Sequence, residues 1–384
     1  MRMGSIIAPL RDFDAAHSRK SAISFVLRIA ALCHIFLAFL VFWLTFQVPS
    51  VAQSSNRAPK RPTYKVIDLG PIKTIASDLV PGLNSLGDVV IWRQNDSQAF
   101  SPLLISGQQQ LPLKIPAGYQ NSFAYSLNDK RNAVGWANTT LNPVDSFSIT
   151  HAFLFTPDQA TDLGTLGGSW SRAYAINNQN KIVGISDLAN KQQQAFQYAD
   201  GKMSPLPPLP GGQSSVAFAV NDAGTVVGGS EVPHTNSVKV EVHAVVWRNG
   251  VPTDMGVLHP NSSSVAHAVN NHDEIVGTAD GPERKTVFLY RDGRMQDLGI
   301  QRARAFSIND RQQIVGTQQT GEERHPHSLG FLWERGKLYD LNTCLPKSSP
   351  YQIQEAFRIN NAGQILAIGV FEEQMHALLL TPVK

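Results

Sequence analysis

The sequence contains almost no cysteine. Among its 384 residues only Cys33 and Cys344 are cysteines, and Cys33 lies in an apolar N-terminal segment. The rest of the chain holds one thiol, which excludes an intrachain disulfide and a cysteine-based zinc site there. We expect Cys344 to be a partly buried small residue.

The chain also lacks an excess of charge of one sign. Residues 1–52 hold five basic and two acidic residues, and the remainder, which we call the body, keeps 28 of each sign. A nucleic-acid-binding protein needs a basic surface to replace the counterions of phosphates, and no Lys/Arg cluster here is dense enough. We therefore predict no nucleic-acid partner.

Catalytic sequence motifs are missing as well. The chain has no Gly-x-Ser-x-Gly, no His-Glu-x-x-His and no phosphate-binding loop. The sequence accordingly predicts no catalytic residue, no metal site and no cofactor.

One long hydrophobic run is present, at residues 29–48, after a basic flank that includes Arg19, Lys20 and Arg28. A basic flank before an apolar run is typical of an export signal, and Ser50 and Ala52 place small residues at a cleavage site. The run is also long enough to span a bilayer as a helix, so cleavage and retention as an anchor both stay open. We predict a signal peptide or anchor over 1–52 and a linker over 53–63. The body would then lie outside the cytoplasm, in the extracellular space, in the periplasm or anchored to the membrane. It would contact the membrane only through residues 29–48, and only if the N-terminal segment is not cleaved.

The body is built from repeats. The segment Ala173–Gly184 (AYAINNQNKIVG) matches Ala217–Gly228 (AFAVNDAGTVVG), and several repeats continue with a second half like His243–Trp247 and a short segment like Asp162–Gly164. The corresponding asparagines are Asn84, Asn128, Asn177, Asn221, Asn270, Asn309 and Asn360, which are 39 to 51 residues apart. This period is typical of propeller blades.

Each repeat predicts four antiparallel strands. The Ala-x-Ala segment alternates with period two, which indicates the first strand, and Asn-Asn or Asn-Asp then makes a turn. Ile-Val-Gly is the second strand, His-Ala-Phe the third and Asp-Leu-Gly the fourth. The final repeat lacks its Asp-Leu-Gly segment, and Tyr64–Gly70 (YKVIDLG) supplies it. We therefore predict an all-β, seven-bladed propeller of four-stranded blades over 64–384, closed by its first strand, with Ala-x-Ala innermost. Six or eight blades and an open solenoid remain alternatives.

The repeat resembles that of the HAF-repeat family of extracellular repeat proteins. The resemblance rests on His151–Phe155, on Asp162–Gly168 (DLGTLGG) and on the Ala-x-Ala to Ile-Val-Gly core, and it covers nearly all of 64–384. The His is missing before Ala195 and Phe331, and Pro205–Pro210 replaces Asp-Leu-Gly. The resemblance implies an extracytoplasmic repeat protein and transfers no catalytic residue.

The predicted blades have two faces. The first face carries the turns between first and second and between third and fourth strands, whereas the second face carries the variable loops between second and third strands. Variable loops on a rigid scaffold are where recognition usually occurs. Candidate ligand-binding residues there are Trp136 and Trp170, which could stack on a ligand or pack at strand edges, and His325 and His327, which could bind a ligand or form a solvated loop.

Two functions follow from these observations. The first is a non-catalytic binding or surface-interaction module, with a glycan or protein of the cell surface as partner. The alternative is a carbohydrate-active hydrolase or lyase, which requires two carboxyl groups roughly 5–10 Å apart. Its candidate acids are Asp187, Glu231, Asp280 and Glu322.

Overall fold

The computed structural model describes residues 61–72, 80–140, 149–233, 241–281, 284–321 and 327–383. Residues 29–48, for which the sequence predicts an export helix, lie outside these ranges, as do residues 50–52 and most of the linker. The described part of the chain consists of strands and one short 3₁₀ helix, η1 (Leu341–Cys344). None of its helical segments is long and apolar enough to cross a membrane.

The strands follow one another in sets of four along the chain. The first sets are β2 (Gly82–Leu83), β3 (Val89–Gln94), β4 (Phe100–Ser106), β5 (Gln109–Pro112); β6 (Asn121–Leu127), β7 (Ala133–Asn138), β8 (Thr150–Phe155), β9 (Ala160–Gly164); and β10 (Gly167–Ile176), β11 (Ile182–Leu188), β12 (Gln193–Ala199), β13 (Lys202–Leu206). The next are β14 (Ser215–Val220), β15 (Val226–Glu231), β16 (Val242–Arg248), β17 (Val251–Asp254); β18 (Ser264–Val269), β19 (Ile275–Asp280), β20 (Lys285–Arg291), β21 (Arg294–Gln301); and β22 (Ala303–Ile308), β23 (Ile314–Thr320), β24 (His327–Glu334), β25 (Lys337–Asp340). The last is β26 (Gln352–Ile359), β27 (Ile365–Phe371) and β28 (Gln374–Pro382) with β1 (Tyr64–Pro71).

The sequence predicts seven separate four-stranded sheets, and the structure corrects this. In the described residues five sheets have four strands each, and a sixth sheet has eight, β6 to β13. The two sets merge because β10 starts early and Trp170 pairs in parallel with Thr150 of β8. Gly168 permits this extension, since a Cβ there would lie 2.5 Å from that of Asp187. The predicted N-terminal helix is likewise not part of the described fold.

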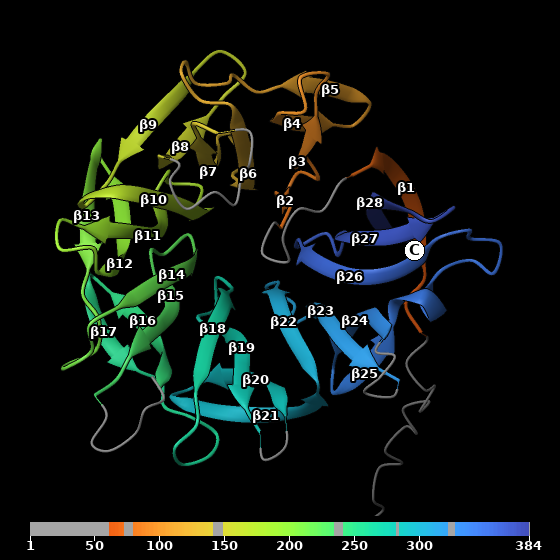
Figure 1. Ribbon diagram of the computed structural model, residues 1–384. Helices are drawn as coiled ribbons and strands as arrows, with labels where there is room; N and C mark the ends of the chain where they lie inside the picture. Colours follow the sequence, from red (N-terminus) through yellow and green to blue (C-terminus); the bar gives the residue numbers. More distant parts are fainter. Residues whose placement is uncertain are drawn as a thin grey trace, which may run out of the picture. The chain divides into compact units, whose positions relative to one another are not determined.

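The ring closes as the sequence predicts. Strand β1 pairs antiparallel with β28, with Tyr64 opposite Pro382 and Ile67 opposite Leu379. Within Arg61–Lys384 the sheets stand around a common axis, and the first and last described strands meet in one sheet (Figure 1). Strands β1 and β28, which are far apart in sequence, thus share backbone hydrogen bonds. This pairing closes the ring.

The Ala-x-Ala strands are innermost, and they approach the second strand very closely. A Cβ on Gly184 would lie 2.0 Å from the Arg172 carbonyl oxygen, and one on Gly228 would lie 1.9 Å from that of Val216. These contacts explain the glycine of the Ile-Val-Gly segment, because any side chain there would push the two strands apart.

The hydrophobic core lies between neighbouring sheets. One cluster joins Val183 and Ala195 of the eight-stranded sheet to Ala217 and Trp247 of the next. Cys344 is fully buried in the cluster beside β26 to β28, so it packs as a small apolar residue.

Candidate functional site

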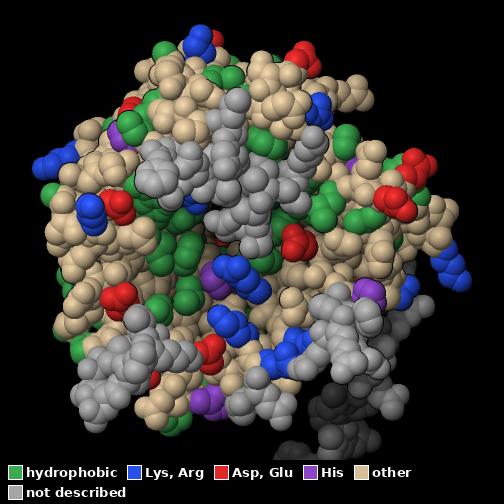
Figure 2. All heavy atoms as spheres, viewed as in Figure 1, with side chains coloured by type: hydrophobic (Ala, Val, Ile, Leu, Met, Phe, Trp, Pro, Cys, Tyr) green, Lys and Arg blue, Asp and Glu red, His purple; other side chains and the backbone are tan. Residues whose placement is uncertain are grey.

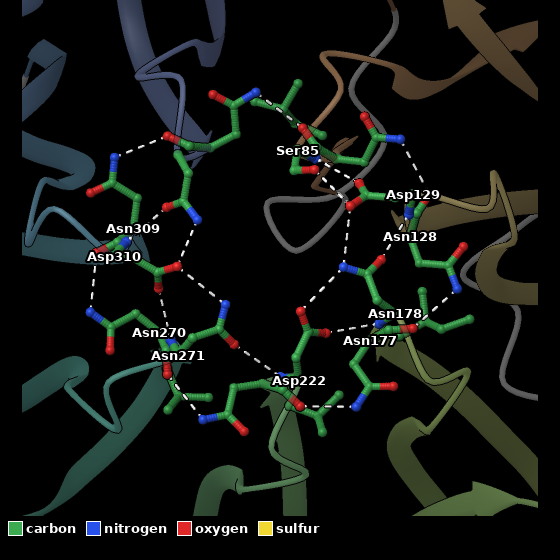
Figure 3. Close-up of a pocket in the computed structure, with 18 of the residues that line it drawn as sticks. Ser85, Asn128, Asp129, Asn177, Asn178, Asp222, Asn270, Asn271, Asn309 and Asp310 are labelled. Carbon is green, nitrogen blue, oxygen red and sulfur yellow. Dashed lines mark hydrogen bonds between the residues drawn. The ribbon is translucent and has the colours of Figure 1, made fainter.

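The first face carries a closed ring of asparagine side chains. The Nδ2 of Asn177 donates to the carbonyl of Asn221 (2.9 Å), that of Asn221 to Asn270 (3.0 Å), and the series continues through every repeat until Asn360 donates to Asn84 (3.1 Å). The remaining links join Asn84 to Asn128, Asn128 to Asn177, Asn270 to Asn309 and Asn309 to Asn360. All seven asparagines line a polar pocket of about 340 Å³, around which Figure 3 shows Asn128, Asn177, Asn270 and Asn309.

Turn chemistry accounts for the same asparagines within each repeat. The Oδ1 of Asn177 accepts the N–H of Gln179 (3.1 Å) and of Lys181 (2.8 Å). The left-handed residue of each turn is not this asparagine but the fourth residue of the turn, as at Asn180 (φ +63°) and Gly224 (φ +86°). The polar groups of this face are thus bonded to one another and to the backbone.

The second face contains a basic pocket near the axis, which we call the mouth. It has a volume of about 450 Å³, and its charged lining residues are Arg284, Lys285, Arg302, Arg304 and Glu355. Figure 2 shows Lys and Arg side chains gathered near the middle of this face. The Nη1 of Arg302 donates to the Gly321 carbonyl (3.1 Å), while its buried Nε has no hydrogen-bond partner among the described residues.

The mouth continues into a second pocket in the axis, which we call the throat. The throat has a volume of about 270 Å³ and shares Arg304 and Phe306 with the mouth. Its other lining residues are Val80, Tyr125, Tyr174, Phe218, His267 and Arg358.

The throat aromatics are the middle residues of the Ala-x-Ala segments. The pairing register shifts at each of them, for example between Ala173 and Ala175 around Tyr174, and between Ala217 and Ala219 around Phe218. A bulge leaves one residue unpaired and redirects its side chain. Neighbouring rings then contact one another, with centroids 5.5 Å apart for Tyr174 and Phe218 and 5.7 Å apart for Phe218 and His267.

Burial changes the pKa of several groups at this end of the axis. Burial and the positive charges of Arg304 and Lys285 lower the pKa of His267 to about 3, so this ring is neutral at physiological pH. Burial lowers the pKa of Arg358 to about 10, which still leaves it charged. Burial also raises the pKa of Glu355, and the charge of Arg304 opposes that rise.

The predicted ligand-binding residues do not come together at the mouth. Trp136 is buried, its Nε1 donates to the Tyr125 hydroxyl (2.5 Å), and the Arg172 guanidinium covers its ring at 4.3 Å. Trp170 is half-buried in β10 and contacts the same guanidinium at 5.1 Å. His327 is exposed at the start of β24, whereas His325 lies outside the described residues. Their role in ligand binding stays a prediction.

The candidate acids lie elsewhere. Asp187, Glu231 and Asp280 occupy the same position near the ends of β11, β15 and β19, and none lines the mouth or throat. Burial raises the pKa of Asp187, and a hydrogen bond from Gln193 opposes it. Glu322 lies outside the described residues. In the described ranges no three His, Cys, Asp or Glu side chains gather in a way that could hold a metal ion.

In three of the repeats the His and Asp of the motif form a pair within one sheet. Nδ1 of His151 lies 2.8 Å from Asp162, that of His243 lies 2.9 Å from Asp254, and that of His376 lies 3.0 Å from Asp68. Thr286 replaces the His in one repeat and donates to Asp297 (2.7 Å). The motif histidine therefore joins the third strand to the fourth, as a structural residue of the sheet does.

Sequence reasoning missed the mouth and throat. A signal existed, because the middle residue of Ala-x-Ala is Tyr, Tyr, Phe, His, Phe and Phe in successive repeats. A strict period-two strand would send that residue to one side of a sheet, and only the bulge turns it toward the axis.

Comparison with known proteins identifies the class of fold. Residues 210–377 match the sequence model of a family described as a protein of unknown function (DUF3466), and no curated protein matches the chain. The β-propeller domain of the trilobed protease from Pyrococcus furiosus, which has an open velcro topology, is similar at 9% identity and a TM-score of 0.52, with 84% of this chain and 96% of that one covered. A puromycin-hydrolysing peptidase from Mycobacterium tuberculosis is similar at 11% identity and a TM-score of 0.50. The likeness covers 83% of this chain and 51% of the peptidase, so the chain spans about half of that enzyme's length. At these identities the likeness concerns the fold alone, and with the ring geometry it identifies residues 61–384 as an all-β propeller.

Proposed function

We propose that this chain is a non-catalytic binding module whose ligand enters the mouth on the second face. The observation that carries this proposal is the continuity of a basic pocket with an aromatic-lined one through Arg304 and Phe306. A concave site with apolar walls and a few convergent polar groups is the usual form of a ligand site. The first face offers fewer free polar groups, because its asparagine side chains donate to backbone carbonyls of the neighbouring repeats.

A hydrolase or lyase fits this site less well. Glycoside hydrolysis requires two carboxyl groups on either side of the bond. Among the described residues Glu355 is the single carboxylate that lines the mouth, and none of their carboxylates lines the throat. The four cations of the mouth would instead attract a negatively charged partner.

The N-terminal segment and the HAF resemblance support a place outside the cytoplasm. The basic flank and apolar run of residues 1–48 have the pattern of an export signal. We propose a glycan or protein of the cell surface as partner. Mass spectrometry of the N-terminus in fractionated cells tests this location, and a chain that starts at Met1 in the cytoplasmic fraction would contradict it.

The binding proposal is tested with arrays of glycans and peptides probed with the purified protein. We expect acidic members to bind, and Arg302→Gln combined with Arg304→Gln to weaken binding at least tenfold, about 1.4 kcal/mol. Lys202→Gln, an exposed residue of β13 outside both pockets, is the matched control and should bind as the unaltered protein does. Binding that survives loss of both arginines would contradict the proposed site.

A further inference from the structure

Arg358 occupies a position that other repeats reserve for small residues. The third residue of the Ala-x-Ala segment is Ser126, Ala175, Ala219, Ala268 and Ser307 in the repeats before it. These residues lie on the innermost strands, next to the axis. An arginine at this position therefore requires space for its side chain and a favourable interaction for its guanidinium.

The space comes from the degenerate first repeat. Its inner strand, β2, has only two residues, and Gly82 lets the backbone approach β6, since a Cβ there would lie 3.0 Å from the Tyr125 carbonyl oxygen. Arg358 extends past this short strand, and its Nη2 lies 3.5 Å from the same oxygen. A side chain from the last repeat thus reaches a strand of the second.

Arg358 has few hydrogen-bond partners among the described residues. Its Nη1 donates to the Phe357 carbonyl at 3.2 Å, and it forms no ion pair with a carboxylate of the described residues. A guanidinium has five N–H donors in a planar fork, and two weak backbone contacts use few of them. Taking a charge partly out of water without a partner is costly, so a half-buried arginine that has no ion pair among the described residues is typical of a site that binds an anion.

The rest of the throat suits an apolar or aromatic group. Tyr125 and Tyr174 have ring centroids 5.9 Å apart, and Phe306 packs against the buried Phe357 behind the pocket lining, with centroids 5.1 Å apart. The Arg304 guanidinium lies 5.2 Å from the Phe306 ring, at the boundary between throat and mouth. His267 is neutral and adds a polar edge to this wall.

We infer that the throat binds a carboxylate attached to an aromatic or apolar group, with Arg358 as its principal cationic partner and Arg304 at the entrance. The inference rests on the proposed binding function and names the ligand chemistry of that same site. Arginine and carboxylate form charge-assisted, bidentate hydrogen bonds, which gives the pair both strength and orientation. The aromatic walls would pack against the attached group. Two sources carry this chemistry, a free aromatic acid and the C-terminal carboxylate of a peptide that ends in an aromatic residue.

The test compares acids with their uncharged analogues by calorimetric titration of the protein. The probes are phenylacetate and phenylacetamide, and a short peptide ending in phenylalanine with a free or an amidated C-terminus. We expect each binding acid to bind at least tenfold more tightly than its amide. Binding of both acids assigns the site to small acids and peptides alike, whereas binding of the peptide alone assigns it to peptide C-termini.

Variants then test whether Arg358 causes the preference for acids over amides. Arg358→Met should weaken acid binding at least tenfold and leave amide binding unchanged, while Arg358→Lys should retain part of the difference. Arg291→Met, at an exposed residue outside both pockets, is the matched control, and an unchanged melting temperature shows that each variant is folded. Equal binding of acid and amide, or no binding of either acid, overturns the inference. If binding of the array ligands still depends on Arg302 and Arg304 in that case, the proposed binding function stands. Only the inference that the ligand is a carboxylate is then wrong.

Discussion

One asparagine in each repeat serves both its own turn and the next repeat. The carboxamide oxygen of Asn177 accepts two backbone N–H groups of its turn, and its nitrogen donates to a carbonyl of the neighbouring repeat. The residue is only 5% exposed, so water cannot replace these bonds. Local turn formation and the joining of neighbouring repeats therefore depend on the same side chain.

We predict that Asn177→Ala lowers the free energy of unfolding by about 2–4 kcal/mol, because the N–H groups of Gln179 and Lys181 lose their acceptor and the Asn221 carbonyl loses one of its two donors. Denaturant unfolding monitored by tryptophan fluorescence measures this loss. Asn190→Ala is the control, since Asn190 is exposed and bonds only within its own turn. Equal effects of the two variants would show that the ring of asparagines contributes no stability.

At the scale of the strand, the His–Asp pairs connect third and fourth strands of one sheet. The pair of His376 and Asp68 differs from the others because its Asp comes from β1, so it also holds the closing strand. Tyr351 donates to the same carboxylate at 3.0 Å. Burial acts to raise the pKa of Asp68, but hydrogen bonds from His376, Gly70 and Tyr351 outweigh it and lower that pKa.

The direction of this shift sets a pH dependence. A carboxyl group whose pKa is lower in the folded than in the unfolded chain stabilises the fold above its ordinary pKa of about 3.9, and this stabilisation is lost as the pH falls through the lowered value. We predict that Asp68→Asn lowers the free energy of unfolding by about 1 kcal/mol at pH 6 and by almost nothing at pH 2.5. Urea unfolding across this range measures it, with Asp158→Asn at an exposed residue as the control. A penalty that stays constant with pH would contradict a role for the ionised carboxylate.

At the scale of the whole molecule, one strand closes the ring. The Val383 N–H donates to the Thr63 carbonyl at 2.8 Å, and Tyr64 faces Pro382, which has no N–H. Since pairs alternate along an antiparallel ladder, the N–H of Ile67 faces β28 and that of Val66 faces outward. The outward side of β1 is the edge of the last sheet.

This alternation gives a matched pair of variants. We predict that Ile67→Pro lowers the free energy of unfolding by about 1–3 kcal/mol more than Val66→Pro, because proline is tolerated at an edge only where its missing N–H faces solvent. Thermal unfolding and limited proteolysis compare the two. Equal stability of both variants would mean that pairing of β1 with β28 does not hold the ring together.

The sequence predicted the features that depend on local spacing. The asparagine period located the turns, Ala-x-Ala located the innermost strands, and the missing last segment located the closing strand Tyr64–Gly70. Such features follow from strand alternation and turn chemistry, which act over a few residues. The sheet count was less predictable, because the parallel contact of Trp170 with Thr150 depends on how far β10 extends past Gly168.

The site was decided by the tertiary structure. Arg304 and Arg358 belong to different sheets, and Tyr125, Tyr174 and Phe218 reach the axis only because a bulge in each inner strand turns them there. No sequence spacing relates Arg358 to Tyr125, which lie 233 residues apart and meet across a strand of two residues. The chain by itself determined the repeat, its turns and its closure, because those are set by neighbouring residues. Only the closed ring determined which side chains share a pocket, because that depends on where distant strands meet at the axis.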